Sequence, residues 1–348
     1  MTGEAPTVSV VMAAYNGAAF IRETIDSVLA QTMPDFEIVV ADDCSKDDTL
    51  AVLATIDDPR LRVVKASRNG GPAVARNLAM AHARGRFIVG LDQDDLCHPE
   101  RFARQIAYLD AHPDVALVCS TIVMFEGVKE RRDPHPDLTD PDAIDWMMGL
   151  LNPLAWSTSM IRGEAARALD PFERDDYRFA EDFDLYTRIR THGRIGRIAE
   201  PLVRYRLHPG GASQAYEEGM IRSAGKVLAD RHAALLGSDA AEAGLLLSRH
   251  AGASHPPPDG ETLARCGAIM MRLLDAEGGS AFPWESSRAL WWRMALSGLR
   301  SGHYGIAEAL RARPTFAGKG TASLPAMLRD AAIGGARRLR RRMATLSL

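Results

Sequence analysis

The stretch Gly85-Arg-Phe-Ile-Val-Gly-Leu-Asp-Gln-Asp-Asp95 joins a short apolar run to a cluster of acidic residues. Phe87 to Leu91 has the length and composition of a buried strand. Asp92, Asp94 and Asp95 follow it directly. Because crowded carboxylates repel one another, the cluster favours a bound cation, and Mg²⁺ or Mn²⁺ prefers such oxygen ligands. The alternative is a solvated acidic loop, and the position directly after a buried strand argues against it.

Two earlier apolar runs end in the same way. Val8–Met12 leads into Tyr15-Asn16, and Phe36–Ala41 leads into Asp42-Asp43. In open α/β sheets, ligands bind beyond the carboxyl ends of the strands. We therefore expect these two polar clusters and the acids at 92–95 to converge on one edge of a sheet.

Helical periodicity separates these runs. Apolar residues recur at helical spacing over 21–29, a second helix is predicted over about 48–57, and a further strand follows at Leu61–Val64. After Asn69-Gly70-Gly71-Pro72, a helix carries Val74, Leu78 and Ala81 on one side. This alternation predicts an α/β fold with a mostly parallel sheet flanked by helices.

The pattern changes beyond about residue 115. The sequence predicts a helix after Glu181-Asp182 and short strands at 115–124, 155–161, 195–198 and 202–207. From 216 onward the chain becomes rich in Ala, Leu and Arg and is predicted to be helical. We therefore expect an α/β domain over 1–215 and a helical C-terminal region over 216–348, with a linker near 252–260.

Composition excludes several classes of protein. The chain has 348 residues, 46% hydrophobic and 25% charged, with a net charge of −3, so it shows no basic field for nucleic acid. No apolar run is long enough for a transmembrane helix, and residues 1–7 lack the features of a signal peptide. The cysteines have no metal-finger spacing, which favours a reduced, cytoplasmic protein. They are Cys44, Cys97, Cys119 and Cys266.

The acid at the end of the second strand has two interpretations. Asp42 and Asp43 can cap the following helix or brace the turn. Asp43 can instead accept the N–H of a nucleobase, and Tyr15 can be either a packing residue or a flat surface beside that base. Arg76 can brace the acidic site or form a surface ion pair.

These features together resemble a family 2 glycosyltransferase of the GT-A fold, a group of inverting enzymes that use nucleotide sugars. The segments that carry the resemblance occur in the family's order and cover about residues 7–213. They are Val8-Ser-Val-Val-Met-Ala-Ala-Tyr-Asn-Gly17, Phe36-Glu-Ile-Val-Val-Ala-Asp-Asp43, Asn69-Gly-Gly-Pro-Ala-Val-Ala-Arg-Asn77, Gly85 to Asp95, Ala180-Glu-Asp-Phe-Asp-Leu185 and Tyr205-Arg-Leu-His-Pro-Gly-Gly-Ala-Ser213.

The resemblance implies a donor site on the first half of the chain. Asp43 would bind the base, with Tyr15 near its ring and the backbone around Ala13 shaping the pocket. Asp92 would lie near the donor ribose or sugar. Asp94, the last acid of the D-x-D, would bind the Mg²⁺ or Mn²⁺ that bridges the diphosphate.

The resemblance also implies an acceptor side. Asp182 matches the catalytic base, and Glu181 would help to orient the acceptor. Arg206 and His208 fall on the segment that closes over the diphosphate or metal. The chain departs from the family pattern near Ser213, where a single serine replaces the usual Ser-x-Ser, so the resemblance carries over no phosphate contact there.

The chemistry of these residues agrees with the implied roles. A carboxylate can take the acceptor hydroxyl's proton, and a cation with Arg or His can stabilise the leaving nucleoside diphosphate. The resemblance further implies a saccharide or lipid-linked saccharide acceptor of a bacterial surface polysaccharide or lipopolysaccharide, with UDP as the first choice of nucleotide.

Other functions fit the sequence less well. Neither the G-x-G-x-x-G of a dehydrogenase nor a P-loop occurs. A sugar-nucleotide nucleotidyltransferase usually carries a Gly-rich basic loop after its first strand, where this chain has Ala13-Ala14-Tyr15-Asn16. A non-catalytic interaction protein on a glycosyltransferase scaffold would have no need for Asp43, Asp94 and Asp182.

The C-terminal segment 326–348 has a pattern of its own. Arg-Arg-Leu-Arg-Arg-Arg at 337–342 lies among apolar residues that share one loose side of a helix. Such a basic amphipathic helix can lie on an anionic membrane, here the inner face of the cell membrane, and a frayed solvated terminus is the alternative. The apolar residues are Leu328, Ala332, Leu339, Met343 and Leu346.

Overall fold

A computed structural model describes residues 5–134, 137–208, 210–211, 216–253, 255–277, 281–318 and 324–346. The chain divides into two compact units. The first comprises Met1–Asp145 and Pro153–Ser223, and the second comprises Trp146–Asn152 and Ala224–Leu348.

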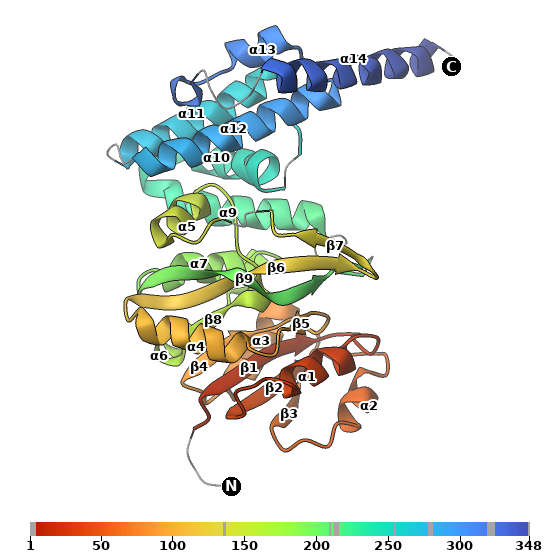
Figure 1. Ribbon diagram of the computed structural model, residues 1–348, viewed down its shortest axis with the longest axis vertical. Coiled ribbons are helices and arrows are strands. Elements are labelled where there is room, and N and C mark those ends of the chain that lie inside the picture. Colours follow the sequence, from red (N-terminus) through yellow and green to blue (C-terminus); the bar gives the residue numbers. More distant parts are fainter. Residues whose placement is uncertain are drawn as a thin grey trace. The chain divides into compact units, whose positions relative to one another are not determined.

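The first unit is built on one sheet, and its N-terminal half has the predicted strand-helix alternation (Figure 1). In the described ranges, nine strands join this sheet, and eight lie in the order β3-β2-β1-β4-β8-β6-β9-β5. The first four run parallel, with β1 between β2 and β4. The elements of this half are β1 (Val8–Ala14), α1 (Ile21–Leu29), β2 (Phe36–Asp42), α2 (Thr49–Ala54), β3 (Leu61–Lys65), α3 (Pro72–Met80) and β4 (Phe87–Gly90).

The second half of the sheet is mixed. β8 runs antiparallel to both β4 and β6, β6 pairs in parallel with β9, and β5 is antiparallel to β9. The short strand β7 pairs with β6 outside the main path. The elements are β5 (Leu96–Cys97), α4 (Arg101–Ala111), β6 (Val115–Glu126), β7 (Lys129–Arg132), α5 (Pro141–Met148), β8 (Met160–Arg162), α6 (Gly163–Ala168), α7 (Glu181–Ile189) and β9 (Arg194–Arg206).

Two sequence predictions in this half are wrong. The strand expected at 155–161 is a 3₁₀ turn, Trp156–Thr158, followed by the shorter β8. The two strands expected at 195–198 and 202–207 are one strand, β9. Pro201 marks the break in its pattern, and the pairing with β6 shifts register there, as in a β-bulge. The break in the apolar pattern between Ile198 and Leu202 is therefore an irregularity within one strand and does not end it.

The central strands are buried on both faces, which explains their continuous apolar sequence. Val8, Val10 and Met12 of β1 are fully buried and pack with residues of β2, β4 and α1. α3 begins at Pro72, after Gly71 in a left-handed conformation (φ 87°). Its buried side is not the one the sequence predicts.

Val74 and Leu78 of α3 are only half-buried and Ala81 is exposed. The helix instead turns three alanines, a methionine and one arginine inward, because Arg76 has acidic partners there. The buried residues are Ala73, Ala75, Arg76, Ala79 and Met80.

The second unit is helical. Asp259 caps the start of α11 by accepting a hydrogen bond from the Thr262 N–H at 2.7 Å. Trp291 and Tyr304 are buried in this unit, and buried Asp330 pairs with Arg300 at 3.0 Å. None of the helices in the described ranges combines the length and apolar character needed to span a bilayer. Its helices are α10 (Ala240–Leu247), α11 (Gly260–Ala276), α12 (Ala281–Ser301), α13 (Ile306–Arg311) and α14 (Leu324–Leu346), together with most of α9 (Glu217–Leu236).

Candidate active site at the carboxyl edge of the sheet

The three polar clusters meet at one edge of the sheet, as the strand order requires. β1 pairs in parallel with β2 on one side and β4 on the other, so their carboxyl ends are neighbours. The Tyr15 N–H donates to Gln93 Oε1 at 3.0 Å, and Gln93 Nε2 donates back to the Tyr15 carbonyl at 3.0 Å. The Asp43 N–H donates to the Ala14 carbonyl at 2.8 Å. The expected convergence is therefore confirmed.

Left-handed backbone conformations occur in the segments that carry the candidate site residues. Of the non-glycine residues that the structure describes, three have a positive φ: Asn16 (49°), Cys44 (62°) and Phe179 (70°). Asn16 follows β1, Cys44 follows Asp43, and Phe179 lies just before Glu181. Such conformations are uncommon for residues with a Cβ and concentrate at ligand sites. Their positions support this edge as the functional site.

Asp43 organises the loop at 69–71. Its side chain is buried, with 3% exposure, and its two carboxylate oxygens accept the N–H groups of Gly70 and Gly71, both at 2.8 Å. Each carboxylate oxygen can accept a further hydrogen bond, so these contacts leave capacity for a ligand. Ala13 is half-buried and Tyr15 is 42% exposed at the same edge.

The acids after β4 each have a different partner. Asp92 Oδ1 accepts a hydrogen bond from Arg76 Nη2 at 2.7 Å. Asp94 Oδ2 lies 2.8 Å from His208 Nε2. Burial and the neighbouring charge of Asp92 raise the pKa of Asp94, and the contact with His208 opposes that rise. Asp95 is buried, which raises its pKa well above the ordinary range.

Arg206 connects the end of β9 to the acidic loop. Its N–H donates to Asp95 Oδ1 and its Nε to the Asp94 carbonyl, both at 2.8 Å, and its Nη2 reaches Glu23 at 2.6 Å. The guanidinium lies over the rings of Phe20 and Phe125. In this arrangement Arg206 shapes the loop that carries Asp94.

The paired acids Glu181 and Asp182 begin α7. Glu181 is buried, and its Oε1 has no hydrogen-bond partner among the described residues. Asp182 is half-buried, and its Oδ1 accepts the Phe183 N–H at 2.7 Å. Acids are favoured at a helix N-terminus because the free N–H groups there carry partial positive charge.

Arg76 brings the acids of different elements together. It is buried on α3, contacts Asp92 after β4 at 2.7 Å, and contacts Glu173 on the segment before α7 at 3.3 Å. The interpretation of Arg76 as a surface ion pair is wrong. Its guanidinium lies over the Trp156 ring at 4.7 Å.

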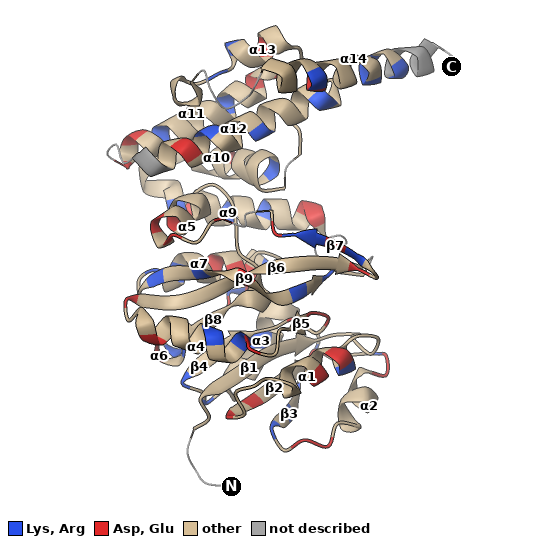
Figure 2. Ribbon diagram, in the orientation of Figure 1, with Lys and Arg blue, Asp and Glu red and all other residues tan. Residues whose placement is uncertain are grey.

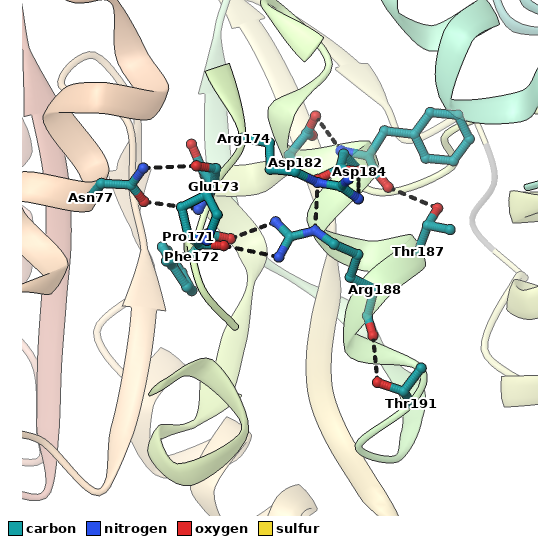
Figure 3. Close-up of polar contacts among 11 residues, drawn as sticks. Asn77, Pro171, Phe172, Glu173, Arg174, Asp182, Asp184, Thr187, Arg188 and Thr191 are labelled. Atoms are coloured by element: carbon teal, nitrogen blue, oxygen red, sulfur yellow. Dashed lines mark hydrogen bonds and ion pairs between the residues drawn. The ribbon is translucent and has the colours of Figure 1, made fainter. Parts of the chain in front are cut away.

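Sequence reasoning missed Glu173. It is fully buried beside Arg76, at 3.3 Å from Nη1. Figure 3 shows it on the segment before α7 that also carries Arg174. Nothing in Asp170-Pro171-Phe172-Glu173 marks it as a site residue in a single sequence.

Among the described residues, no group of three or more His, Cys, Asp or Glu side chains is arranged to hold a metal.

Comparison with known proteins identifies the class. The family model described as glycosyl transferase family 2 matches residues 9–169 of this chain. A 106-residue stretch is 49% identical to the succinoglycan biosynthesis protein ExoO of Rhizobium meliloti, covering 30% of each chain. A 208-residue stretch is 31% identical to EpsE of Bacillus subtilis, a glycosyltransferase by its assigned name, covering 58% of this chain and 73% of EpsE.

Solved structures agree on the architecture. Residues 1–349 of S. aureus TarS, crystallised with UDP-GlcNAc, superpose with a TM-score of 0.53 at 20% identity, covering 84% of this chain and 90% of that one. The shared architecture is the GT-A fold of glycosyltransferases. The chain belongs to glycosyltransferase family 2. Its match spans less than a third of the length of ExoO.

Proposed function

We propose that this protein is an inverting glycosyltransferase that moves a sugar from a nucleotide-diphosphate sugar to a hydroxyl of a saccharide acceptor. The observation that carries the proposal is Arg76, whose buried guanidinium contacts Asp92 of the D-x-D segment and Glu173 on the segment that leads into the paired acids of α7. The segments proposed for donor and acceptor thus lie around one side chain. TarS was crystallised with UDP-GlcNAc, which makes UDP the first nucleotide to test.

Asp43, Tyr15 and Ala13 would bind the nucleoside. Asp43 would accept the N–H of the base with the lone pairs that Gly70 and Gly71 leave free. The exposed ring of Tyr15 would lie beside the base. Asp92, 33% exposed at its side chain, would contact the ribose or the sugar while Arg76 holds its other oxygen.

A divalent cation, Mg²⁺ or Mn²⁺, fits the donor set of Asp94 and His208. Their side chains lie within 2.8 Å of each other, and each is about 20% exposed. The carboxylate of Asp94 suits either ion, and Mg²⁺ commonly takes one or two carboxylates and completes its shell with substrate phosphate and water. When bound, the ion would supply positive charge against the diphosphate. Arg206 would keep Asp94 in place through its backbone carbonyl.

Asp182 would act as the general base. A carboxylate at the helix N-terminus can hydrogen-bond the acceptor hydroxyl and take its proton as the new bond forms. Glu181, with a buried and unpartnered Oε1 among the described residues, would orient the acceptor. No covalent intermediate on the protein is needed for inversion.

The product would enter a bacterial surface polysaccharide, on the cytoplasmic side of the membrane. Relatives such as ExoO, named for succinoglycan biosynthesis, support this class of acceptor. A sugar-nucleotide nucleotidyltransferase is the weaker alternative because it gives the paired acids on α7 no task. The other alternative, a non-catalytic interaction protein on this scaffold, can be distinguished by assay because it would release no nucleotide from any nucleotide sugar.

We propose further that α14 contacts an anionic membrane. Among its described residues, Leu324, Leu328 and Leu339 are 61%, 53% and 61% exposed, and the helix carries several arginines (Figure 2). Arg337 and Arg338 also donate to backbone carbonyls of the second unit, at 3.3 Å and 3.0–3.3 Å. The exposed leucines with arginines beside them favour an interfacial helix. The basic residues at 341–342 have side chains outside the described residues.

Liposome co-sedimentation tests that contact. The full chain should bind vesicles rich in anionic lipid, and a chain ending at Leu324 should not. Leu328→Ser with Leu339→Ser should weaken binding without disturbing the buried side of α14. Equal binding by all three proteins, or binding that ignores lipid charge and salt, would contradict the proposal.

A thermal-shift panel of nucleotide sugars tests the main proposal. UDP, GDP and dTDP sugars are compared with and without Mn²⁺. One nucleotide class should raise the melting temperature, and the rise should be larger with Mn²⁺. A panel without any shift would contradict the proposed donor site.

A further inference from the structure

A fully buried acid outside the resemblance motifs contacts Arg76. Glu173 has 0% exposure, and its two carboxylate oxygens lie 3.3 and 3.4 Å from Arg76 Nη1. The opposite amino group, Nη2, donates to Asp92 Oδ1 at 2.7 Å. The same guanidinium lies over the Trp156 ring, 4.7 Å from its centroid. Arg76 is thus held at one end by Glu173, at the other by Asp92, and on one face by Trp156.

The segment that carries Glu173 is held from two helices (Figure 3). From α3, the Asn77 side chain donates to the Glu173 carbonyl at 2.7 Å and accepts the Glu173 N–H at 2.8 Å. From α7, Arg188 donates to the carbonyls of Pro171 and Phe172 at 3.0 and 2.7 Å. Arg188 is itself paired with Asp184 at 2.8 Å.

These anchors do not use the Glu173 carboxyl group. The segment would keep its place through the backbone bonds to Asn77 and Arg188 even if the side chain were shortened. A buried carboxyl group is costly unless it is paired, and an apolar side chain of similar size would cost less. The contact that the carboxyl group does make is with Arg76. The buried carboxyl group of Glu173 is therefore better explained by its contact with Arg76 than by a role in holding the segment.

The geometry points to Glu173 as a positioning residue for the donor site. Through Nη1 it fixes the rotation of the Arg76 guanidinium, so that Nη2 holds the carboxylate of Asp92 at the edge where the donor binds. Glu173 itself would not touch the donor. This inference rests on the proposed function, because it needs Asp92 at the nucleotide-sugar site.

A double-mutant cycle tests whether Glu173 acts through Arg76. Calorimetry measures the affinity for UDP, and for the nucleotide sugar with the largest shift in the panel, in the presence of Mn²⁺. Wild type, Glu173→Ala, Arg76→Met and the double variant are compared. Glu173→Gln keeps an oxygen that can accept from Nη1, and Glu164→Ala removes an exposed acid as the matched control.

Glu173→Ala should weaken binding of the nucleotide sugar about tenfold, a loss typical of one coupled polar contact. Glu173→Gln should stay within about threefold of wild type, and Glu164→Ala should not differ. In the Arg76→Met background, Glu173→Ala should cause almost no further loss. Circular dichroism and melting temperature verify that each variant is folded.

Two results would overturn the inference. A folded Glu173→Ala variant with wild-type affinity would show that the contact does not matter for the donor. A loss that adds in full to that of Arg76→Met would show that Glu173 acts by another route, such as the fold of its segment. If wild type binds no nucleotide or nucleotide sugar at all, the proposed function fails instead, so the two failures are distinguishable.

Discussion

Replacing Glu173 with Gln should change how the stability of the protein depends on pH. Burial raises the pKa of Glu173 from 4.5 to about 8, the positive charge of Arg76 opposes the rise, and the charges of Glu181 and Asp182 add to it. Between pH 4.5 and 8 the folded state therefore holds a proton that the unfolded state has released. The free energy of unfolding of the wild type falls as pH rises through this range.

The magnitude follows from the size of the shift. A rise from 4.5 to about 8 corresponds to up to about 5 kcal/mol, since one pKa unit is worth about 1.4 kcal/mol. The cost is absent below pH 4.5 and complete above pH 8. Glu173→Gln cannot ionise, so it escapes this cost at every pH. Any constant cost of the amide beside Arg76 cancels when two pH values are compared.

Urea unfolding at pH 5 and pH 8.5 measures the effect. Relative to wild type, Glu173→Gln should gain several kcal/mol between the two values. Glu126→Gln, the same change at an exposed end of β6, should show no such gain. A difference between Glu173→Gln and wild type that stays constant with pH would refute the reasoning. Glu173 would then be ionised throughout as the partner of Arg76.

Three further changes have defined outcomes. Asp94→Asn should abolish sugar transfer and the Mn²⁺-dependent part of the nucleotide thermal shift, and Mn²⁺-dependent turnover near wild type would contradict the metal assignment. Gly90→Ala would place a Cβ 2.6 Å from atoms of Trp156 and Ser159. Urea unfolding should show a loss of stability of about 1–3 kcal/mol, and an unchanged unfolding midpoint would refute this close approach. Gly71→Ala forces a Cβ onto a residue at φ 87° and ψ 175°, at a cost of about 1–3 kcal/mol. It should weaken nucleotide binding because the Gly71 N–H holds Asp43, and unchanged affinity would separate this loop from the donor site.

The sequence predicted the parallel half of the sheet well because two signals agreed there. Buried strands such as Val8–Met12 carry continuous apolar runs, and polar residues mark their carboxyl ends. Tyr15, Asp43 and Asp92 could be placed at one edge from that pattern and the rule for open α/β sheets. The strand order with β1 between β2 and β4 then brings them together.

The mixed half was harder because local pattern does not show which strand pairs with which. At Ala155–Ile161 the apolar composition of a strand belongs to a buried 3₁₀ turn, since Trp156 packs beneath Arg76. In β9 the proline at 201 is the signal of a strand end, and only the partner strand β6 shows that the strand continues. In both cases a tertiary contact decided the local structure.

Glu173 could not be found from the sequence for a related reason. It lies 97 residues from Arg76 in the chain, and its segment has no composition that distinguishes it from an ordinary loop. The buried side of α3 was misplaced by the same partnership. A helical pattern of apolar residues favoured Val74 and Leu78, but the acids that face Arg76 turn that arginine inward.

Nuclear magnetic resonance of nucleotide-sugar turnover by wild type and Asp182→Asn tests the central claim most directly. Both proteins receive the nucleotide sugar from the panel, Mn²⁺ and a saccharide or water as acceptor. Wild type should release the nucleoside diphosphate and form a product of inverted anomeric configuration. Asp182→Asn should bind the donor with wild-type affinity and turn it over about 10² times more slowly, as expected for a lost general base. A product of retained configuration, or equal turnover by both proteins, would contradict the account.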